Sequence, residues 1–398
     1  MKFNEMKTNG MKAIRSASDL AINGAPPAFK DIVHVGRPNL GDRDALLQYV
    51  GQIYDRRWLS NHGPLVHELE KRIADKHGVK HCVAMCNGTI ALEIAIRALG
   101  LEGEVIIPSY TFVATAHALH WQAITPVFAD IDPATHNLDP DAVRRMITPR
   151  TSGIIGVHLW GRCAPVAELQ AIADEHGLQL MFDAAHAFGC SDRGSTIGRF
   201  GRCEVLSFHA TKVFNTFEGG AVITNDDQLA EAMQLMRNFG FKGFDNVIHP
   251  GTNGKMTEIS AAMGLVNLEA LPDFIDANKA RYDRYADAFA GIDGVDLIRY
   301  DQADAPNYQY VVVEVDASKR DALVDALHAE NILARKYFWP GCHGMKPYRE
   351  LFPHARLMLP NTEHVAARVI VLPTGETLPE GCIETIAAVC RMVLGAGG

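Results

Sequence analysis

The sequence predicts an α/β protein, with a large domain built on a mostly parallel sheet and a smaller α+β domain after it. Between residues 79 and 227, short apolar runs alternate with segments whose apolar residues recur at helical spacing. The runs are apolar throughout, which is typical of strands covered on both faces of a parallel sheet. Two of the helical segments end in glycine, the residue that most readily takes the left-handed conformation after a helix. The expected strands are VIIP, TPVFAD, GIIGVHL, LQLMFDA, EVLSFH and AVITN.

We expect three regions along the chain of 398 residues. Residues 1–25 are polar, show no sustained period and read as a tail or an arm laid across another part of the molecule. Residues 26–270 form the large domain, and their N-terminal segment contributes to the small one. Residues 271–398 form the small α+β domain, which helical sequence beginning near residue 256 joins to the large domain.

Composition excludes several classes of protein. Hydrophobic residues make up 47% and charged residues 21%, which is ordinary for a folded globular chain. The net charge of −9 gives no overall electrostatic attraction for nucleic acid or an anionic membrane. No apolar run approaches the roughly 20 residues that span a bilayer, and the N-terminus does not resemble a signal peptide. With eight scattered cysteines that suit reduced thiols, we expect a cytoplasmic protein.

Motifs of other α/β enzymes are missing from the sequence. No G-x-G-x-x-G follows an expected strand, and no G-x-x-x-x-G-K-[ST] occurs, so nicotinamide and ATP chemistry are disfavoured. His117 and His120 have a spacing that could bind a metal, but no third ligand accompanies them. A packing or capping role is favoured for both, and we expect no metal site.

Three segments place polar residues directly after expected strands, where ligands bind in parallel sheets. Asp183 ends an apolar strand, with His186 three residues on, and a carboxylate at a buried strand end is costly without a cationic or proton-donating partner. Lys212 lies among small and hydroxylated residues between two apolar stretches, unlike an ordinary surface lysine. Gly88 and Thr89 begin a helix after a strand, which points helix N-terminal amides at an anion such as a phosphate.

Together these three features describe a site for pyridoxal phosphate. The aldehyde of this cofactor needs a lysine, its ring nitrogen needs an acid that keeps it protonated, and its phosphate needs a cradle of amides. Each segment taken alone is more often structural than functional, because single motifs mislead. Their joint occurrence, in this order on a parallel-sheet background, favours function.

From about residue 58 to 270 the chain resembles the DegT/DnrJ/StrS family of sugar-nucleotide aminotransferases, and weaker similarity extends to the C-terminal region. These are pyridoxal phosphate enzymes of fold-type I, the aspartate aminotransferase-like fold. The resemblance rests on long, well-separated motifs. They are CNGTIAL, PSYTFVAT, DIDPATHNLDPDAV, DAAHAFG, SFHATKVFNTFEGGA and TNGKMTEISAAMG.

The resemblance implies a role for each residue that would contact the cofactor ring. Lys212 is similar to the lysine that binds the aldehyde covalently and acts as nucleophile and general acid/base. Asp183 matches the partner of the ring nitrogen, and His186 stands where the family has Gln or His near the ring hydroxyl. Phe112 has the position of the aromatic that stacks on the ring, although it could equally be a core residue.

The resemblance also implies the residues that hold the phosphate. Ser207, five residues before the lysine, matches a phosphate-contacting serine, and Gly88 and Thr89 match the amide cradle. Asn253 matches an asparagine that reaches the phosphate from the other subunit, which implies a homodimer with a shared active site. Ser207 as a strand-end cap and Asn253 as a turn residue are the structural alternatives.

Contacts to the sugar nucleotide are harder to assign. The segment RKYFWPGCH sets cations beside aromatic residues, which suits a pyrophosphate and a base or sugar face. Its Tyr337, Phe338 and His343 are candidates, and a solvated charge beside a buried aromatic patch is an equally good interpretation. Trp160 and Arg162, in HLWGR near a strand end, are weaker candidates.

The motif around Lys212 indicates the reaction. F-H-x-T-K followed by E-G-G is similar to family members that aminate the 4-keto carbon of TDP-4-keto-6-deoxyglucose, as in desosamine formation. The resemblance implies transfer of the amino group of L-glutamate to that carbon, giving TDP-4-amino-4,6-dideoxyglucose and 2-oxoglutarate. The alternatives are a 3-keto or other nucleotide sugar, and a pyridoxal phosphate-dependent dehydratase, a class with histidine in place of this lysine. A non-catalytic regulator is the third, and it would need neither Lys212 nor Asp183.

Overall fold

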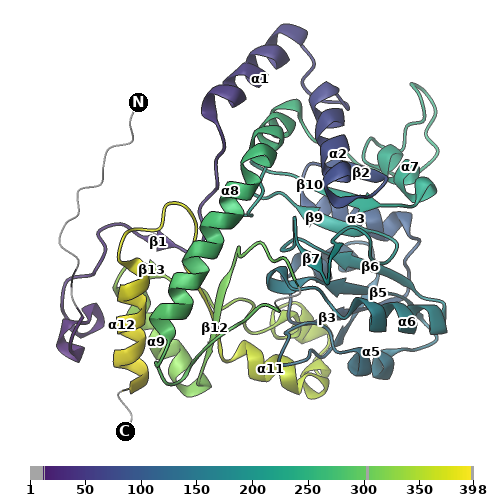
Figure 1. Cartoon of the computed structure of the whole chain (residues 1–398). Helices are drawn as coiled ribbons and strands as arrows, with labels where there is room; N and C mark the ends of the chain where they lie inside the picture. Colours follow the sequence, from purple (N-terminus) through teal and green to yellow (C-terminus); the bar gives the residue numbers. More distant parts are fainter. Residues whose placement is uncertain (1–11, 13, 302–303, 396–398) are drawn as a thin grey trace.

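The centre of the molecule is a seven-stranded sheet with strand order β2-β10-β9-β6-β5-β3-β4 (Figure 1). The computed structural model describes residue 12, residues 14–301 and residues 304–395. The strands are β2 (His81–Met85), β3 (Glu104–Pro108), β4 (Thr125–Ala129), β5 (Thr151–Val157), β6 (Gln179–Asp183), β9 (Glu204–Ser207) and β10 (Gly220–Thr224).

Strand directions confirm a mostly parallel sheet, with one exception. Strand β10 is antiparallel to both of its neighbours, β2 and β9, while the other neighbouring pairs are parallel. From β2 to β6 the parallel strands are separated along the chain by helices that cross back over the sheet. The crossover from β6 to β9 contains no helix, only the short strands β7 (Ser191–Asp192) and β8 (Ser195–Thr196). No helix lies between β9 and β10, and the chain turns back on itself through residues 208–219. That turn carries Lys212, so the direct return of the chain brings the lysine to the edge where the parallel strands end.

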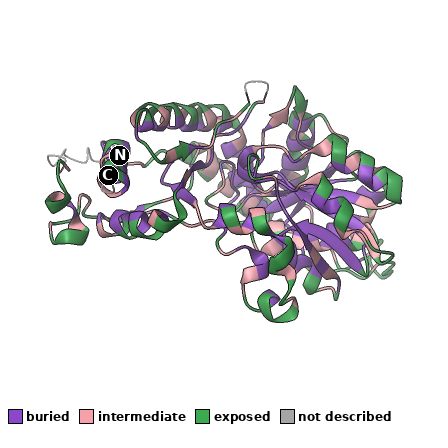
Figure 2. Cartoon of the chain, turned by 90° about the horizontal axis from the view of Figure 1, so that it is seen from below, coloured by how far each residue is buried: buried purple, intermediate pink, exposed green. Residues whose placement is uncertain are grey.

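Helices cover both faces of the sheet, as the apolar strands predict. One face packs against α3 (Gly88–Ala98), α4 (Ala114–His120) and α7 (Asp227–Met236) in a core that includes Met85, Ile107 and Val205. The opposite face packs against α2 (Pro64–His77) and the first half of α8 (Glu258–Phe289) at one end. At its other end this face packs against α5 (Pro140–Met146) and α6 (Val166–His176). Figure 2 shows the strands of this layer as buried ribbon between partly exposed helices.

Helix α8 links the large sheet to a second core (Figure 1). Two segments with helical sequence form this one helix, which Thr257 caps by accepting a hydrogen bond from the Ser260 amide and which runs on through Pro272. The second core contains the antiparallel sheet β11-β12-β14 packed against α9 and α12. Its elements are β11 (Val295–Leu297), β12 (Val311–Val315), α9 (Ala317–Ala329), β14 (Val369–Leu372) and α12 (Cys382–Gly395).

The N-terminal part of the large region also reaches the second core. Strand β1 (Val33–His34) pairs in parallel with β13 (Ile332–Leu333), and α1 (Arg43–Arg56) then leads back toward α8. The predicted boundary at residue 270 falls within α8, and the division of the chain into domains stays a prediction. Short helices α10 (Tyr348–Leu351) and α11 (Pro360–Ala366) lie between β13 and β14.

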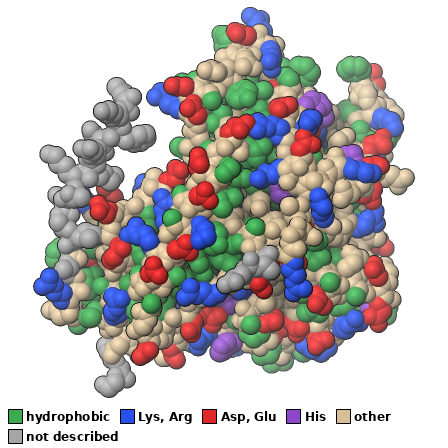
Figure 3. Space-filling model, viewed as in Figure 1, with side chains coloured by type: hydrophobic (Ala, Val, Ile, Leu, Met, Phe, Trp, Pro, Cys, Tyr) green, Lys and Arg blue, Asp and Glu red, His purple; other side chains and the backbone are tan. Residues whose placement is uncertain are grey.

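The surface carries charges of both signs. Figure 3 shows acidic and basic side chains interspersed over the face that it draws. In the part of the chain that the structure describes, no helix is long and apolar enough to cross a membrane. Residues 1–11 and 13 of the predicted N-terminal tail lie outside the described residues. Lys12 pairs with Glu330 at 3.1 Å between Nζ and Oε2.

Candidate active site

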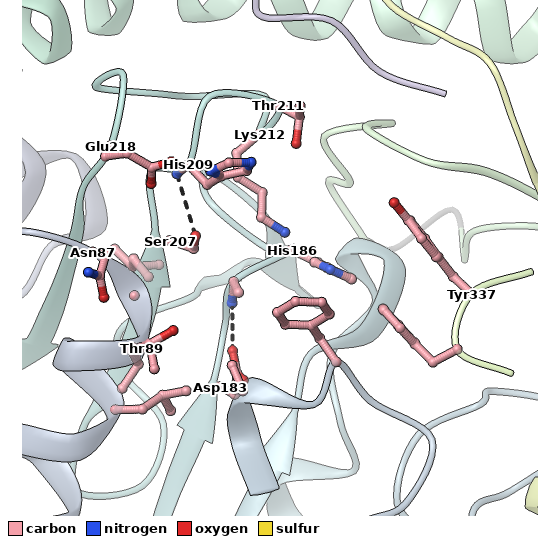
Figure 4. Close-up of a pocket in the computed structure, with 18 of the residues that line it drawn as sticks. Asn87, Thr89, Asp183, His186, Ser207, His209, Thr211, Lys212, Glu218 and Tyr337 are labelled. Atoms are coloured by element: carbon pink, nitrogen blue, oxygen red, sulfur yellow. Dashed lines mark hydrogen bonds and ion pairs between the residues drawn. The ribbon is translucent and has the colours of Figure 1, made fainter. Parts of the chain in front are cut away.

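A pocket of about 320 Å³ opens at the carboxyl ends of the parallel strands (Figure 4). It contains seven of the residues that the sequence places at the cofactor. These are Gly88, Thr89, Phe112, Asp183, His186, Ser207 and Lys212. Two of the predicted substrate contacts, Tyr337 and Phe338, also line it. Strand ends, the turn between β9 and β10, and the segment after β13 therefore meet in one cavity.

Lys212 extends from the β9–β10 turn into this pocket (Figure 4). Its Nζ donates a hydrogen bond to the hydroxyl of Tyr310 at 3.1 Å. Burial lowers the pKa of Lys212 to about 8, against the opposing effect of the Asp183 charge. The amine is therefore neutral in an appreciable fraction of molecules near neutral pH, as a nucleophile requires.

Asp183 lies at the end of β6 and is buried. Its Oδ2 accepts a hydrogen bond from the Thr115 hydroxyl at 2.8 Å, and its Oδ1 accepts one from the Ala185 amide at 3.1 Å. Burial raises the pKa of Asp183, while these hydrogen bonds and the charge of Lys212 act in the other direction. The carboxylate is thus fixed in orientation and has a raised affinity for a proton or a protonated base.

His186 is held in one tautomer by its neighbours. Its Nδ1 accepts a hydrogen bond from the Trp160 amide at 3.4 Å, which leaves the proton of the neutral ring on Nε2. Burial, with the charge of Lys212 adding to it, holds the pKa of His186 well below its usual value. The ring lies between Trp160 and Tyr310, with centroid separations of 5.7 Å and 4.4 Å. His186 therefore offers a neutral N–H donor to the pocket.

The start of α3 forms the opposite wall from Tyr337 (Figure 4). Asn87 caps this helix by accepting a hydrogen bond from the Ile90 amide at 2.8 Å, so the first turn is fixed in place. Close approach requires glycine at two positions. A Cβ on Gly220 would lie 2.6 Å from the backbone nitrogen of Gly88, and one on Gly88 would lie 3.1 Å from the Ser207 Cβ. Helix N-terminal amides and the Ser207 hydroxyl suit an anion here.

Phe112 is 59% exposed although it lines the pocket. Its ring centroid lies 6.2 Å from that of Phe338. An aromatic face left open in a cavity with a lysine amine, a buried carboxylate and an amide cradle suits a flat aromatic ligand. The residues present therefore fit pyridoxal phosphate.

Four other predicted site residues do not line this pocket. Trp160 is buried beneath it, with its ring stacked on Phe338 at a centroid distance of 5.4 Å. Arg162 donates hydrogen bonds to main-chain carbonyls, including that of Ala134 at 3.1 Å. The other two are His343 and Asn253.

His343 is buried, and its two ring nitrogens contact Ser109 at 2.7 Å and Glu363 at 2.8 Å. Asn253 is exposed and pairs with Asn238 in an isolated antiparallel bridge. Its neighbour Gly254 accepts a hydrogen bond from the Cys86 amide at 2.8 Å, which anchors this segment next to the start of α3. The roles predicted for these four residues stay predictions.

Four residues at the site were not expected from the sequence: Tyr310, Thr115, and the pair of His209 and Glu218. The pair is joined at 2.7 Å and lines the pocket beside Ser207. No local pattern marks Tyr310, which lies within an expected strand and reaches Lys212 only through the fold. Thr115 could have been suspected, because it is the last residue of the PSYTFVAT motif, three residues after Phe112.

One three-residue group outside the pocket has side chains of the metal-binding type. Ligand atoms of His62, His67 and Glu70 lie within 4.8 Å of one another. Glu70 already accepts hydrogen bonds from the Arg237 guanidinium and from the Ala84 amide at 2.8 Å. This saturated carboxylate is better described as part of a buried ion-pair network than as a metal ligand.

A doubly covered, mostly parallel sheet with a lysine and an aspartate in a pocket at its carboxyl edge defines an aminotransferase-type α/β enzyme. Residues 41–392 match the DegT/DnrJ/EryC1/StrS aminotransferase family, and the chain belongs to that family. This confirms the predicted family, the predicted fold-type I architecture and the prediction of a sugar aminotransferase.

Relatives and solved structures agree with this assignment. The chain is 36% identical over 364 residues to dTDP-4-amino-4,6-dideoxy-D-glucose transaminase of Shigella dysenteriae, a match that covers 91% of this chain and 99% of the relative. It is 34% identical to GDP-perosamine synthase of Caulobacter vibrioides, with 91% and 98% covered. Among solved structures, that of DesI in the presence of its TDP-sugar product matches with a TM-score of 0.90, 48% identity, and 95% and 98% covered.

Proposed function

We propose that the protein transfers the amino group of L-glutamate to the 4-keto carbon of TDP-4-keto-6-deoxyglucose, using pyridoxal phosphate. The products are TDP-4-amino-4,6-dideoxyglucose and 2-oxoglutarate. The observation that carries the proposal is the Lys212 amine, with a pKa of about 8, in one pocket with buried Asp183 and the α3 amides. The TDP-sugar product of DesI and the name of the Shigella relative support the sugar and the carbon.

Each side chain has a defined task in this reaction. Asp183 would hold the ring nitrogen of the cofactor, and Phe112 and His186 would contact its ring. Ser207 and the α3 amides would bind its phosphate. When bound, the cofactor accepts an amino group at its aldehyde carbon and draws electrons from the carbon that loses a proton. Lys212 would move that proton. Because its amine is readily neutral, it can accept the proton from one carbon and deliver it to the other within each half of the reaction, in opposite directions in the two halves.

Tyr310 gives Lys212 a partner in both protonation states. Its hydroxyl accepts from the amine when Lys212 is charged, and it can donate to the nitrogen lone pair when Lys212 is neutral. Burial raises the pKa of Tyr310, so the phenol keeps its proton through the reaction.

We further propose a homodimer with a shared active site, in which Asn253 reaches the cofactor phosphate of the partner. Support comes from the exposure of Asn253 away from its own pocket and from exposed apolar side chains near it. Large exposed apolar residues mark interaction sites. In the segment 239–248 they are Phe239 (45%), Phe244 (98%), Val247 (55%) and Ile248 (45%), and in the loop after α1 they are Trp58 (49%) and Leu59 (64%).

The experiment is product NMR after incubation of TDP-4-keto-6-deoxyglucose with nitrogen-15 glutamate. We expect the label on C-4 of a 4-amino-4,6-dideoxyglucose. Protein that carries its cofactor and gives no labelled sugar would contradict the proposal. A GDP-linked keto sugar is the second candidate, favoured by the similarity to GDP-perosamine synthase, and would be tested in the same way.

A further inference from the structure

We propose that three side-chain amides, those of Asn39, Asn267 and Gln309, position the β9–β10 turn so that Lys212 can react with the cofactor aldehyde. We call these three side chains the amide frame. The inference rests on the proposed function, in that Lys212 reacts with pyridoxal phosphate. It adds positioning residues for that reaction, which act on the lysine through the main chain on either side of it.

The β9–β10 turn, residues 208–219, has no helix or strand of its own to hold it. Figure 4 shows the Lys212 side chain extending from this turn into the pocket. The Lys212 amide donates to the carbonyl of His209 at 2.8 Å, within the turn. Three carbonyls next to this point receive no hydrogen bond from a main-chain amide of the described residues. They belong to Thr211, Val213 and Asn215.

Two members of the amide frame hold the turn after Lys212. Asn39 donates through Nδ2 to the carbonyl of Val213 at 3.1 Å. Asn267, in α8, donates through Nδ2 to the carbonyl of Asn215 at 2.9 Å. All four of these partners are buried. Because a buried carbonyl without a donor is costly, the two side chains fix the path of the main chain here.

The third member holds the turn before Lys212. Gln309, which is buried just before β12, donates through Nε2 to the carbonyl of Thr211 at 3.4 Å. The longer distance makes this the weakest of the three bonds. The next residue, Tyr310, contacts the Lys212 amine at 3.1 Å. Gln309 therefore ties the turn to the segment that supplies the hydrogen-bond partner of the lysine amine.

Two members of the frame are themselves fixed by further hydrogen bonds. The carbonyl of Asn39 accepts from the Asn215 side chain at 2.8 Å, so the two segments bond in both directions. Asn267 accepts through Oδ1 from the Gly41 amide at 2.8 Å. The approach is close, because a Cβ on Gly41 would lie 2.8 Å from Cγ1 of Val266. The segment 39–41, the turn and α8 are thus directly connected.

Uncharged donors suit this place because Lys212 must be neutral to react. A carboxylate beside the turn would raise the pKa of the amine, as Asp183 already does, and a cationic side chain would lower it further. Side-chain amides donate to carbonyls and do not ionise. The frame can therefore hold the lysine in place and add no charge to its surroundings.

Reaction with the aldehyde is sensitive to the position of Lys212, because a displacement of about 1 Å can cost about 100-fold in rate. Binding that does not involve the lysine lacks this sensitivity. Pyridoxamine phosphate has an amine in place of the aldehyde, so it cannot bond covalently to Lys212 and would bind through the ring and phosphate contacts. A comparison of the two ligands therefore separates positioning of the lysine from general support of the pocket.

The test compares cofactor-free Asn267→Ala with cofactor-free wild type. We expect stopped-flow absorbance to show covalent capture of pyridoxal phosphate about 10- to 100-fold slower in the variant, with affinity for pyridoxamine phosphate changed less than threefold in a fluorescence titration. The capture rates are compared where they level off at high pH, so that a change in protonation is not mistaken for a change in position.

Asn278→Ala is the matched control and should capture pyridoxal phosphate at the wild-type rate. Asn278 is a buried asparagine of the same helix, and it donates to the Asn307 carbonyl at 3.4 Å rather than to the turn. Should Asn267→Ala fail to fold, Asn39→Ala, which removes the bond to Val213, supplies the same comparison.

Capture of pyridoxal phosphate by Asn267→Ala within twofold of the wild type would overturn the proposal. So would equal losses of capture rate and of affinity for pyridoxamine phosphate, since the frame would then support the whole pocket. A rate in Asn278→Ala as slow as that in Asn267→Ala would overturn it as well. No sugar enters these measurements, so failure of the proposed function in the nitrogen-15 assay is a separate result.

Discussion

Lys212 has surroundings that no surface lysine has, and they account for its reactivity. Burial removes the water that stabilises the protonated amine of Lys212. The attraction of the Asp183 carboxylate compensates for this loss only in part, so the pKa of Lys212 falls to about 8. Aldehydes react with the neutral form of an amine. At pH 7 about one amine in eleven is neutral with a pKa of 8, compared with about one in three thousand at the usual value.

We therefore expect the rate at which cofactor-free protein binds pyridoxal phosphate to rise with pH and to level off just above pH 8. The sign follows from the lowered pKa, because the neutral fraction grows until the amine has lost its proton. Stopped-flow absorbance between pH 6 and 10 measures this rate. A rate that keeps rising tenfold per pH unit up to pH 10 would mean that the pKa is not lowered. Lys212→Ala should show no such absorbance change and no transfer of nitrogen.

The contact between Tyr310 and Lys212 leads to a second expectation. Tyr310→Phe removes the hydroxyl 3.1 Å from Nζ and keeps the ring that packs on His186. We expect kcat to fall about 10- to 100-fold, the usual contribution of an assisted proton transfer, with each KM changed less than threefold. Steady-state kinetics with both substrates measures the effect.

Tyr300→Phe is the matched control for Tyr310→Phe. The Tyr300 hydroxyl donates to the main-chain oxygens of Trp160 at 3.1 Å and Tyr310 at 3.3 Å, and it makes no contact with Lys212. Equal losses of kcat in the two variants would assign the effect to packing rather than to proton transfer.

At the residue scale, the sequence predicts site residues that have a local pattern, but it does not predict contacts between residues far apart in the chain. Lys212 and Asp183 could be predicted, because each directly follows or ends an apolar strand in a fold where such positions share an edge. Tyr310 could not, because it lies 98 residues from Lys212 along the chain and its own surroundings are those of a strand. Trp160 was expected near the substrate, and the structure places it below the pocket as support for Phe338 and His186.

At the scale of elements, the site depends on how closely β10 approaches the start of α3. Gly220 pairs with Met85 and Ser207 in the sheet, and its missing side chain leaves room for the Asn87–Gly88 peptide. The amides of the first turn of α3 are thus held by the sheet itself.

We expect Gly220→Ala to weaken binding of pyridoxal phosphate at least tenfold and to lower the free energy of unfolding by about 1–3 kcal/mol. A Cβ there would lie 2.6 Å from backbone atoms that cannot move without shifting α3, and such overpacking has this cost. Fluorescence titration with the cofactor and urea unfolding measure the two quantities. Gly51→Ala, in α1 with no neighbouring atom within 4 Å of the added methyl group, should leave cofactor binding unchanged. Unchanged binding in Gly220→Ala would show that α3 does not hold the phosphate.

The sequence predicted where the strands lie along the chain better than it predicted how they pair in the sheets. The six expected strands are found because burial on both faces leaves a continuous apolar run. The antiparallel direction of β10 was not predicted, because hydrophobic periodicity carries no information about direction. Strands β1 and β13 pair over only two residues, which is too short for a periodic signal in the sequence. The expected strand NYQYVVVEV begins only at Val311 in the structure, because the side chains of Asn307 and Gln309 donate hydrogen bonds to neighbouring loops.

At the scale of the whole molecule, a shared site means that each active site takes residues from both chains of the dimer. Lys212 and Asn253 would then serve different active sites of one dimer. A Lys212→Ala chain has an intact Asn253 to give its partner, and an Asn253→Ala chain has an intact Lys212. A mixed dimer therefore has one site with both residues and one with neither.

Mixing the two variants after reversible dissociation should consequently restore activity that neither variant has alone. Random reassociation of equal amounts makes half of the dimers mixed, each with one intact site of two, so we expect about a quarter of wild-type activity. The assay is transfer of nitrogen-15 from glutamate to the TDP-sugar, with subunit exchange followed by mass spectrometry of differently tagged chains. The control pairs Lys212→Ala with Asp183→Ala, because both residues belong to the same chain's pocket and one mixed site then lacks Lys212 while the other lacks Asp183. If the first mixture also stays inactive although exchange is complete, Asn253 acts within its own chain and the proposal of a shared site is wrong.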